Sequence, residues 1–405
     1  MTQVLLGSLV FTGLIMALVL VVLGARRLLL PQGLARNTVN GDRVLDAELG
    51  QKLLPALDHG GLHLPSSCGG AGTCGLCRVT VSSAGDALPV ERSALGPAEI
   101  ARGLRLACQV VVRGDLSLTI AESLLAAQSW SCTVSQTRTV APLIKEIVFA
   151  LPPDLDLHYR AGAYVEVTAP AFRLPFAQIE VAPRHQEAWA RLGVKGLEAG
   201  AAAPLARAYS LANPPGAAAA LVLNVRLALP PAGRPDVPPG VVSSWLFGLK
   251  VGDRIRMAGP FGDFFVMDTE REIVLIGGGV GMAPLHAIVL EQLEQRRTAR
   301  RISFWYGARS VIDLFYEDEM ARLAAEHPNF SWHVALSDPA PDDAWTGEVG
   351  FVHEFVHRQH LRGHADPGSC EYYLCGPPLM IEAVRAMLGR LRVPPENIRF
   401  DDFGG

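Results

Sequence analysis

The sequence predicts a multidomain protein with four parts: an N-terminal transmembrane helix, a small α+β domain, an antiparallel β-barrel domain and a C-terminal doubly wound α/β domain. Three observations lead to this prediction. Residues 4–24 carry no charge, three of the seven cysteines lie close together among glycines, and the apolar pattern changes in the last third of the chain. We expect the parts to cover residues 1–30, 31–127, 128–268 and 269–405.

Length and charge limit the possible classes of protein. At about 150 residues per domain, 405 residues allow two to three domains. The 36 basic and 40 acidic residues give a net charge of -4, and no stretch interleaves basic with aromatic residues, so we expect no nucleic-acid partner. Seven cysteines are an odd number and too few for a disulfide framework, which favours reduced thiols or metal ligands.

The uncharged run at 4–24 is long enough to cross a bilayer core of roughly 30 Å as a helix. A cleaved signal peptide is the alternative, but MTQ before the run has no basic side chain and no clear small-residue cleavage site follows. Arg26 and Arg27 come directly after the run. The positive-inside rule therefore predicts a permanent single-pass anchor with the large C-terminal part on the cytoplasmic side.

The next two segments are rich in strand patterns. Residues 38–127 contain the runs CRVTVSS and ACQVVVRGDLSLTI, which predict short strands around a Gly-rich loop. Residues 128–268 contain runs such as AYVEVTAP and LVLNVRLAL between Pro, Gly and Asn, which predict an antiparallel barrel or sandwich. Within it, we expect the Ala-rich stretch 186–206 to be irregular and the Pro-rich stretch 230–240 to be a loop.

The last segment has a different pattern. REIVLIGG, RISFWYGA, FSWHVALS and CEYYLCG are short continuous apolar runs, as in buried parallel strands. Helical patterns such as LHAIVLEQLEQRRTAR and PLMIEAVRAMLGRL lie between them. This alternation predicts a doubly wound α/β domain.

Four cysteines form a metal-ligand pattern: Cys68, Cys74, Cys77 and Cys108. Four thiolates suit tetrahedral zinc or an iron–sulfur cluster. Structural zinc sites usually use two CxxC-like pairs, whereas here three ligands share one Gly-rich loop and the fourth comes from a distant strand, which favours [2Fe–2S]. The spacing resembles the C-x4-C-x2-C of plant-type ferredoxins with one extra residue, and this implies a β-grasp fold. Cys132 and Cys370 are too dispersed to suggest a second site.

Two stretches of the predicted barrel resemble the FAD-binding signature of the ferredoxin–NADP reductase family. In ARAYSLANP, the two-residue period places Arg207 and Tyr209 on one face and Ser210 on the other. They offer a guanidinium for phosphate, an aromatic plate for a ring and a hydroxyl for its edge. An ordinary Arg–Tyr strand pair is the alternative for this stretch alone. Downstream, a helix start forms a possible anion site with Gly240, Ser243 and Ser244. We expect Tyr209 and Ser210 to be catalytic residues at the flavin ring.

Two further stretches are similar to the nicotinamide-binding motifs of the same reductase family. IVLIGGGVGMAPL matches GGGxGxAP rather than G-x-G-x-x-G, and its turn brings backbone N–H groups towards a pyrophosphate through Gly277, Gly278, Gly279 and Gly281. YYLCGPPLM holds Cys375, Gly376 and Pro377. The resemblance places CGP where nicotinamide meets flavin and makes Cys375 catalytic; a small buried apolar residue is the alternative.

The chain ends in RFDDFGG. In the reductase family a terminal aromatic covers the flavin, so the resemblance gives Phe403 a catalytic and FAD-contacting role. A frayed aromatic at a chain end is the alternative.

The order of the motifs is similar to that in the F subunit of the sodium-translocating NADH:quinone oxidoreductase family of bacterial inner membranes. The resemblance extends over the whole chain. It implies an electron-input subunit that oxidises NADH by hydride transfer to FAD and passes single electrons to a [2Fe–2S] cluster. It also implies a six-subunit assembly, ubiquinone as final acceptor and coupling to sodium export. The predicted span itself has no ionisable residue for a sodium path.

Two other functions fit parts of the sequence. The reductase component of an oxygenase can join the same three modules but would normally be soluble, so the membrane anchor argues against it. A membrane-tethered carrier or zinc module without catalysis would leave GGGVGMAP and CGPP unexplained.

Overall fold

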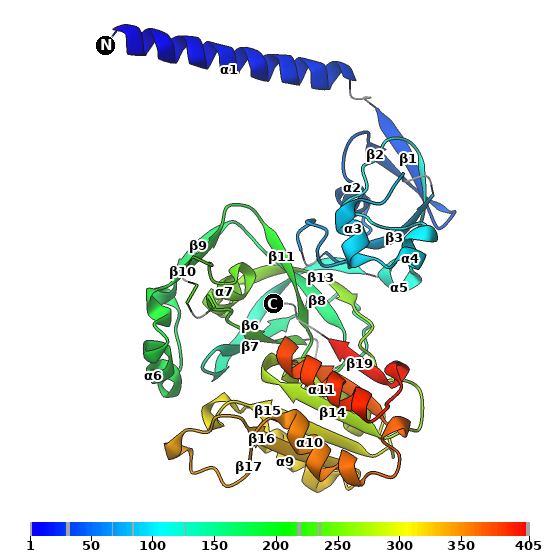
Figure 1. Cartoon of the computed structure of the whole chain (residues 1–405), viewed down its shortest axis with the longest axis vertical. Helices are drawn as coiled ribbons and strands as arrows, with labels where there is room; N and C mark the ends of the chain where they lie inside the picture. Colours follow the sequence, from blue (N-terminus) through cyan, green and yellow to red (C-terminus); the bar gives the residue numbers. More distant parts are fainter. Residues whose placement is uncertain are drawn as a thin grey trace. The chain divides into compact units, whose positions relative to one another are not determined.

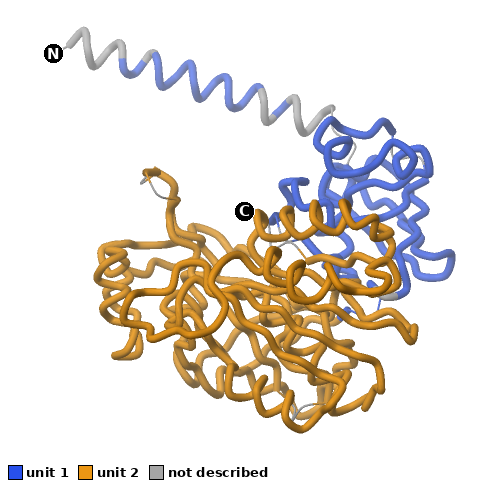
Figure 2. The backbone as a smooth tube through the Cα atoms, turned by 60° about the horizontal axis from the view of Figure 1, so that its bottom comes forward, with its two compact units in different colours: residues 1–127 blue, residues 128–405 orange. Residues whose placement is uncertain are grey.

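The computed structural model describes residues 2–29, 33–66, 68–82, 85–125, 127–216, 220–231, 233–234 and 236–401. The chain forms two compact units, residues 1–127 and residues 128–405, which Figure 2 shows in blue and orange. Each apolar core of the described residues lies within one of these units.

The first unit begins with helix α1 (Thr2–Leu29), drawn in dark blue in Figure 1. Large apolar side chains such as Leu9, Phe11 and Val21 are exposed on it. Within the described part of the chain, no helix combines the length and the apolar character that a membrane crossing requires. The expected span at 4–24 falls in part on residues whose side chains lie outside the described set.

The rest of the first unit is a ferredoxin-like α+β domain, as predicted. Its sheet has the order β2-β1-β5-β3-β4, with β1 and β5 parallel and the other neighbours antiparallel. The strands are β1 (Leu34–Val39), β2 (Arg43–Glu48), β3 (Arg78–Ser82), β4 (Leu104–Leu106) and β5 (Leu116–Thr119). The helices are α2 (Leu53–His59), α3 (Pro89–Ala94), α4 (Pro97–Ala101) and α5 (Glu122–Leu125). Helix α2 buries Leu53, Ala56 and Leu57 in the domain core.

One strand prediction in this domain was wrong. The run ACQVVVRGDLSLTI forms a strand only at its end, in β5, and Cys108 lies in a turn after β4. In this turn, Ala107 N–H donates to Cys77 O at 2.8 Å and Gln109 N–H to Leu106 O at 2.8 Å. These hydrogen bonds turn the chain and place Cys108 beside the loop that carries the other three cysteines.

The second unit begins with a curled antiparallel sheet of the order β11-β8-β13-β6-β7-β12. Its strands are β6 (Gln128–Ala141), β7 (Ile144–Ala150), β8 (Tyr164–Ala169), β11 (Leu205–Ser210), β12 (Ala220–Arg226) and β13 (Arg254–Phe261). The edge strands β11 and β12 meet at the isolated bridge Leu211–Leu223 and not along a continuous ladder, so the sheet is a curled half-barrel where we predicted a barrel or sandwich. Helix α7 (Val241–Gly248) packs into its apolar core with Val242, Leu246 and Phe247.

The stretch 186–206 is more regular than predicted. It contains most of helix α6 (Pro183–Arg191) and strand β10 (Glu198–Ala201), which pairs with β9 (Phe172–Pro175). Proline starts α6, where its missing N–H costs nothing. Trp189 is buried in the barrel core, and this tertiary contact outweighs the weak local pattern.

The end of the second unit is the predicted doubly wound α/β domain. Its parallel sheet has the order β17-β16-β15-β14-β18-β19. The strands are β14 (Ile273–Gly278), β15 (Ile302–Ala308), β16 (Phe330–Leu336), β17 (Glu348–Val349), β18 (Glu371–Cys375) and β19 (Ile398–Asp401). Helices α8 (Met282–Leu290) and α9 (Glu317–Glu326) share one apolar core with the sheet, and α10 (Val352–Gln359) and α11 (Pro378–Arg390) share another. The order changes direction at β14, whose neighbours are β15 and β18.

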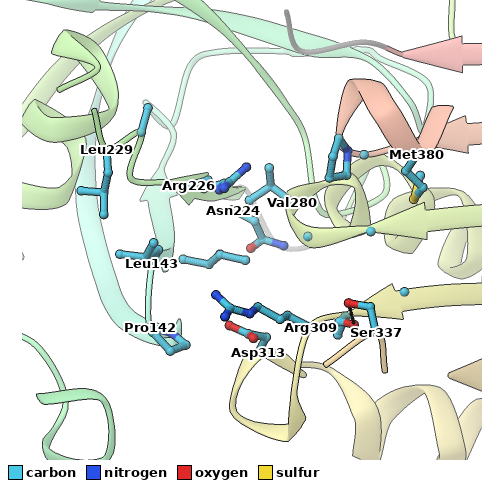
Figure 3. A pocket seen from close by; sticks show the side chains of 18 of the residues that line it. Pro142, Leu143, Asn224, Arg226, Leu229, Val280, Arg309, Asp313, Ser337 and Met380 are labelled. Atoms are coloured by element: carbon cyan, nitrogen blue, oxygen red, sulfur yellow. Dashed lines mark hydrogen bonds between the residues drawn. The ribbon is translucent and has the colours of Figure 1, made fainter. Parts of the chain in front are cut away.

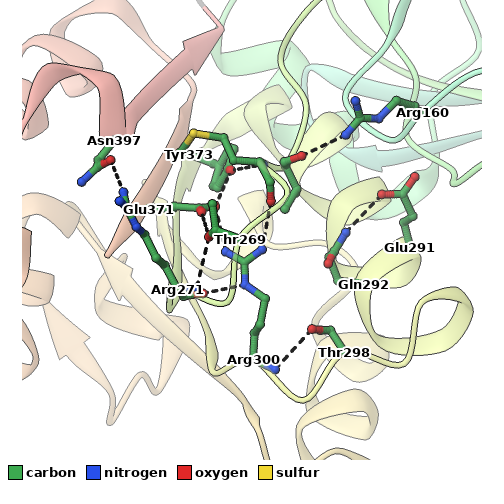
Figure 4. A network of polar contacts seen from close by, with 12 residues as sticks. Arg160, Thr269, Arg271, Glu291, Gln292, Thr298, Arg300, Glu371, Tyr373 and Asn397 are labelled. Atoms are coloured by element: carbon green, nitrogen blue, oxygen red, sulfur yellow. Dashed lines mark hydrogen bonds and ion pairs between the residues drawn. The ribbon is translucent and has the colours of Figure 1, made fainter. Parts of the chain in front are cut away.

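The half-barrel and the α/β domain are joined by apolar and polar contacts. Val140, Ala141 and Ile144 of the half-barrel belong to the same apolar core as α8 and α9. The connecting segment, residues 262–272, joins β13 to β14. Figure 4 shows the polar network that holds it: Met267 bonds to Arg300 and Tyr373, and Arg300 forms a buried ion pair with Glu371 at 2.8 Å. The connecting segment is therefore fixed to the sheet rather than extended through solvent.

Candidate redox sites

A cavity of about 1590 Å³ lies between the half-barrel and the α/β domain of the second unit (Figure 3). Its α/β wall is formed at the carboxyl ends of the parallel strands, by Gly278 at the end of β14, Arg309 after β15 and Gly376 after β18. In open α/β sheets, ligands bind at these strand ends where the strand order changes direction. The cavity therefore has the position expected of a dinucleotide site.

The half-barrel wall contains the predicted flavin residues of β11. Arg207, Tyr209 and Ser210 all line the cavity, although neighbours in a strand point to opposite faces. Burial raises the pKa of the Tyr209 phenol, which nearby Arg207 partly offsets. The Ser210 hydroxyl donates to Asp401 Oδ2 at 3.0 Å. A guanidinium, an aromatic ring and an oriented hydroxyl are thus gathered on one wall.

The start of α7 supplies a second part of this wall. Gly240 and Ser243 line the cavity, whereas Ser244 is fully buried. Both hydroxyls donate to Gly240 O, at 3.0 Å from Ser243 and 2.6 Å from Ser244. A Cβ at Gly240 would lie 2.7 Å from Ala228 Cβ, so the turn requires glycine. The N–H groups of the first helical turn, rather than these hydroxyls, are then the donors that a phosphate would meet.

The glycines of the predicted nicotinamide turn have two different placements. Gly278 and Gly279 line the cavity, while Gly277 and Gly281 lie beneath it. A Cβ at Gly281 would lie 1.9 Å from Cys375 O, so the backbones of the turn and of β18 pack directly on each other. Gly281 thus brings the turn close to the sheet, and its neighbours present backbone to the cavity.

The CGP motif is also divided. Gly376 and Pro377 line the cavity, but the side chain of Cys375 is fully buried in the apolar core with α8. Burial of this kind suits the small apolar role of cysteine. Phe403 lies outside the described residues, which end at Asp401.

Sequence reasoning missed several polar residues of the cavity. Figure 3 shows Asn224 and Arg226 of the half-barrel facing the side of the cavity that holds Arg309 and Asp313. Asp338 also lines it, and its Oδ2 lies 3.2 Å from both Nε and Nη2 of Arg309. Arg309 directly follows β15 and Asp338 is the second residue after β16, so the rule that ligands bind at carboxyl strand ends could have identified them.

A polar latch beside the cavity joins the two halves of the unit. On α8, His286 contacts Ala212 O through Nδ1 at 2.6 Å and Glu319 through Nε2 at 2.9 Å. The ring stacks on Tyr316 with centroids 4.4 Å apart, and the Tyr316 hydroxyl donates to Asn224 Oδ1 at 3.0 Å. The hydrogen bond from His286 lowers the pKa of Glu319 despite its partial burial. These contacts fix the α/β domain against the half-barrel.

The four predicted metal ligands of the first unit come together. Cys68 and Cys74 have their Sγ atoms 3.3 Å apart, and Cys77 and Cys108 are buried. Burial opposes ionisation of Cys68, but hydrogen bonds from the backbone and side chain of Cys74 and from the backbone of Gly72 and Thr73 lower its pKa to about 6.

In the second pair of cysteines, as in the first, one thiol has a lowered pKa and its partner has a raised one. A hydrogen bond from the Cys77 thiol lowers the pKa of Cys108 to about 7 against the effect of burial, and it raises the pKa of Cys77. Gln109 Nε2 also donates to Cys108 Sγ, at 3.3 Å. Donors that stabilise thiolates are what a tetrathiolate site requires.

The cluster loop depends on glycine. Gly69, Gly70, Gly72 and Gly75 all have positive φ angles, between 64° and 91°. A Cβ at Gly72 would also lie 2.8 Å from Gln109 Nε2, the atom that donates to Cys108. Four sulfurs with backbone donors around them fit a [2Fe–2S] cluster.

Comparisons with known proteins identify the types of domain in the two units. Residues 37–113 match the 2Fe-2S iron-sulfur cluster binding domain family, and residues 275–386 match the oxidoreductase NAD-binding domain family. The chain is 44% identical over 407 residues to the F subunit of the Na(+)-translocating NADH-quinone reductase of Methylococcus capsulatus, with 100% of both chains covered. It is 43% identical over 404 residues to the F subunit of the same reductase in Neisseria meningitidis serogroup C, again with 100% of both covered.

Two solved structures are similar in fold over most of the chain. The Amycolatopsis cytochrome P450 reductase GcoB has a TM-score of 0.64 and 29% identity, covering 91% of this chain and 98% of its own. The ferredoxin reductase in carbazole 1,9a-dioxygenase has a TM-score of 0.61 and 23% identity, covering 92% and 99%, and this likeness concerns the fold alone.

Proposed function

The chain belongs to the family of the F subunit of the Na(+)-translocating NADH-quinone reductase, and on this premise we propose that it is the electron-input subunit of such an enzyme. It takes electrons from NADH in the cavity of the second unit and passes them through FAD to a [2Fe–2S] cluster in the first. The observation that carries the proposal is the cavity itself, which has flavin-type residues on one wall and a nicotinamide-type turn on the other. FAD bound there would supply the conversion of the electron pair of a hydride into the single electrons that a [2Fe–2S] cluster requires.

The flavin wall has a clear division of tasks. Arg207 and the first N–H groups of α7 bind the pyrophosphate, because a guanidinium and a helix start both favour phosphate oxygens. Tyr209 packs against the ring, and its raised pKa keeps the phenol neutral and donating. Ser210 presents its oxygen at the ring edge, with its proton directed to Asp401.

The opposite wall positions the nicotinamide. The backbone at Gly278 and Gly279 approaches the pyrophosphate, and Gly376 and Pro377 form the edge beside the reacting ring. Arg309 and Asp338 contact the adenosine end of the cofactor. Because the polar latch of His286 fixes the two walls, the two rings are held in one relative position.

In the first unit, Cys68, Cys74, Cys77 and Cys108 bind the cluster, and the N–H donors of the Gly-rich loop stabilise its negative charge. The functional parts follow the boundaries 1–30, 31–127, 128–268 and 269–405. Residues 4–24 anchor the chain in the bacterial inner membrane, with the redox domains on the cytoplasmic side. The partners are the other membrane subunits of a six-subunit complex, which deliver electrons to ubiquinone.

A second candidate function is supported by the likeness to a cytochrome P450 reductase. In this function, the same electron path would end at an oxygenase instead of at membrane subunits. Purification of the full chain from its native membrane, with identification of the proteins that accompany it, separates the two: membrane subunits support the first function and an oxygenase supports the second.

The redox activity itself is tested with purified full-length protein without oxygen. NADH should bleach the flavin absorption at least as fast as the enzyme turns over, and it should accelerate the reduction of ferricyanide. No acceleration of ferricyanide reduction by NADH would refute the proposal. Metal analysis that finds zinc in place of iron and labile sulfide would refute the cluster.

A further inference from the structure

Four side chains that can act as metal ligands lie at the amino ends of the parallel strands, whereas the redox cavity lies at their carboxyl ends. Glu272 directly precedes β14, His360 and His364 flank the short helix η7 (Leu361–Gly363), and Cys370 directly precedes β18. The redox cavity lies at the carboxyl end of β14, so the length of this strand, roughly 17 Å, separates the two places. The His-x3-His-x5-Cys spacing also lies outside the segments used for NADH.

The ligand atoms of three of these residues converge, and Cys370 contacts one of the three. The candidate ligand atoms of Glu272, His360 and His364 all lie within 4.8 Å of one another. Individual separations are 2.9 Å from His360 Nε2 to Glu272 Oε1 and 3.5 Å from His364 Nε2 to Glu272 Oε2. Cys370 Sγ lies 3.6 Å from His364 Nε2.

Three of these separations can be compared with those of a tetrahedral zinc site. With Zn–N and Zn–O bonds of about 2.0–2.1 Å and Zn–S of about 2.3 Å, tetrahedral angles place N and O roughly 3.3 Å apart and N and S roughly 3.6 Å apart. The observed nitrogen–sulfur separation of 3.6 Å equals the tetrahedral value. Of the two nitrogen–oxygen separations, 2.9 Å is shorter and 3.5 Å is longer than the tetrahedral value. Only small side-chain shifts would be needed to admit the ion.

The hydrogen bonding of this cluster is incomplete. His360 Nε2 is buried, and none of the described atoms forms a hydrogen bond of good geometry with it, although the Glu272 carboxylate is close. A buried ring nitrogen without such a partner costs free energy unless something else binds its lone pair. The side chains of the two histidines and Glu272 are only 12–18% exposed, so bulk water does not serve them freely.

Two neighbours bear on metal binding. Arg301 Nη1 lies 3.8 Å from Glu272 Oε2, but its side chain is 74% exposed and can swing into solvent. The N–H of Asp366 approaches His364 Nδ1 at 3.2 Å. A metal on Nε2 places the ring proton on Nδ1, so this contact has to open when the ion binds. A cavity of about 550 Å³ that is lined by Glu272, His333 and His360 gives the ion an entry path.

The structure assigns to these residues a site for a zinc-like divalent ion, with Glu272, His360, His364 and Cys370 as ligands. The ion joins the connection between α10 and β18 to the start of β14, and so stabilises the α/β domain from the end that the cofactors do not use. It takes no part in electron transfer, since zinc has a single stable oxidation state in proteins. This site is separate from the four cysteines of the first unit, and it does not depend on the proposed function.

The test uses full-length protein that carries its iron–sulfur cluster and flavin, after removal of loose metal with a weak chelator. Titration with Co²⁺ should give tetrahedral d–d bands and a thiolate charge-transfer band, and Zn²⁺ should abolish both in a ratio of one per chain. Thermal unfolding should move to higher temperature with Zn²⁺, because an ion that binds only the folded state stabilises it.

Variants locate the ion. His364→Ala and His360→Asn should each weaken Zn²⁺ binding at least tenfold, and Cys370→Ser should remove the thiolate band while keeping weaker binding. His357→Ala, on the same α10 but outside the cluster, should leave affinity unchanged. Circular dichroism of each variant without metal shows whether it folds, and the milder Cys370→Ser remains decisive if a histidine variant does not.

The inference is overturned if no saturable binding occurs, if His357→Ala weakens binding as much as His364→Ala, or if Zn²⁺ acts only by displacing iron from the first unit. The absorption of the iron–sulfur cluster is recorded in the same titration and reports the last case. NADH-dependent flavin reduction is measured separately, so failure of the metal site and failure of the redox function give different results.

Discussion

The hydroxyl of Ser210, the last residue of β11, donates a 3.0 Å hydrogen bond to Oδ2 of Asp401, the last residue of β19. The two residues are 191 positions apart in the chain. The bond joins the flavin wall of the cavity to the final strand of the α/β sheet, directly before the terminal segment. Asp401 thereby acts as a positioning residue for a hydroxyl at the expected flavin edge.

Removing this carboxylate should slow hydride transfer without loss of the fold. In Asp401→Ala the Ser210 hydroxyl is no longer fixed, and loss of a hydrogen bond to a charged acceptor, worth about 1.5–3 kcal/mol, corresponds to a roughly tenfold or greater fall in rate. Stopped-flow flavin reduction by NADH measures it. Ser210→Ala should give the same fall, and the double variant should be no slower than either. Additive losses would show that Asp401 does not act through Ser210.

Cys74→Ala should abolish the visible absorption of the cluster and leave flavin reduction by NADH intact, because the two sites lie in different compact units. Absorption spectra and stopped-flow kinetics of the same sample test both statements. Cys132→Ala is the matched control: this cysteine is buried in the half-barrel core and should keep the cluster. Loss of flavin reduction in folded Cys74→Ala protein would contradict the separation of the sites.

The pair of Arg309 and Asp338 should favour NADH over NADPH. The Asp338 carboxylate repels a 2′-phosphate and occupies the guanidinium that could bind one. In Asp338→Asn, the ratio of kcat/KM for NADPH to that for NADH should rise at least tenfold. Asp236→Asn, which breaks a similar ion pair with Arg234 outside the cavity, should leave the ratio unchanged. An unchanged ratio in Asp338→Asn would show that the 2′-position of the bound dinucleotide does not lie near Asp338.

Glu371→Ala should destabilise the second unit strongly. Its carboxylate is fully buried, pairs with Arg300 and accepts a hydrogen bond from the Tyr373 hydroxyl at 2.7 Å (Figure 4). Removing one partner of a buried ion pair leaves the other charge uncompensated and costs about 3–5 kcal/mol. Chemical denaturation measures the loss. Glu326→Ala removes an exposed ion pair with Arg322 and should change stability far less. Equal effects of the two substitutions would show that the buried pair contributes little.

Lys145 should make the half-barrel more stable as pH rises above neutrality. Burial lowers the pKa of this amine to about 8 from 10.5, although it donates to Phe247 O and Leu249 O. Between these pH values the unfolded chain binds more protons than the folded one, so the free energy of unfolding increases with pH. From about pH 7.5 to about pH 9.5 the gain is on the order of 2 kcal/mol.

Denaturation at several pH values in that window tests this contribution. Lys145→Gln should have a flatter pH profile than the wild type, whereas Lys195→Gln, at an exposed position, should keep the wild-type slope. Measurements stay below pH 10 because the buried tyrosines, whose pKa values are raised, begin to oppose the trend there. Identical slopes for the wild type and Lys145→Gln would exclude Lys145 as the source.

Much of the fold follows from local pattern. The continuous apolar runs of the last third became the parallel strands, with Val274 and Ile276 on one face of β14 and Ile273 and Leu275 on the other. The four cysteines met because their loop has the glycines that its backbone requires. Periodicity and spacing are enough where the sequence itself carries the constraint.

Other features depend on contacts between distant segments, and the sequence does not show these. Helix α6 is stabilised because Trp189 packs in the half-barrel core. Cys108 lies in a turn and not in a strand, because its neighbour Ala107 is hydrogen-bonded to Cys77. Cys375 was expected at the nicotinamide, but the approach of Gly281 to its carbonyl puts the thiol in the core. The cluster of Glu272 and His360 joins residues from separate strands and loops, which only a folded chain reveals.

The apolar core shared by β6, β7, α8 and α9 limits how this protein can evolve. A recombination event that replaced only the nicotinamide domain would cut through side chains that interlock, and the hybrid would have to repack Val140 and Ile144 against foreign partners. Substitutions in this shared core should therefore occur together, with a change on one side compensated by a change on the other. Exchange of a whole functional block is easier at residue 127, where one compact unit ends and the other begins.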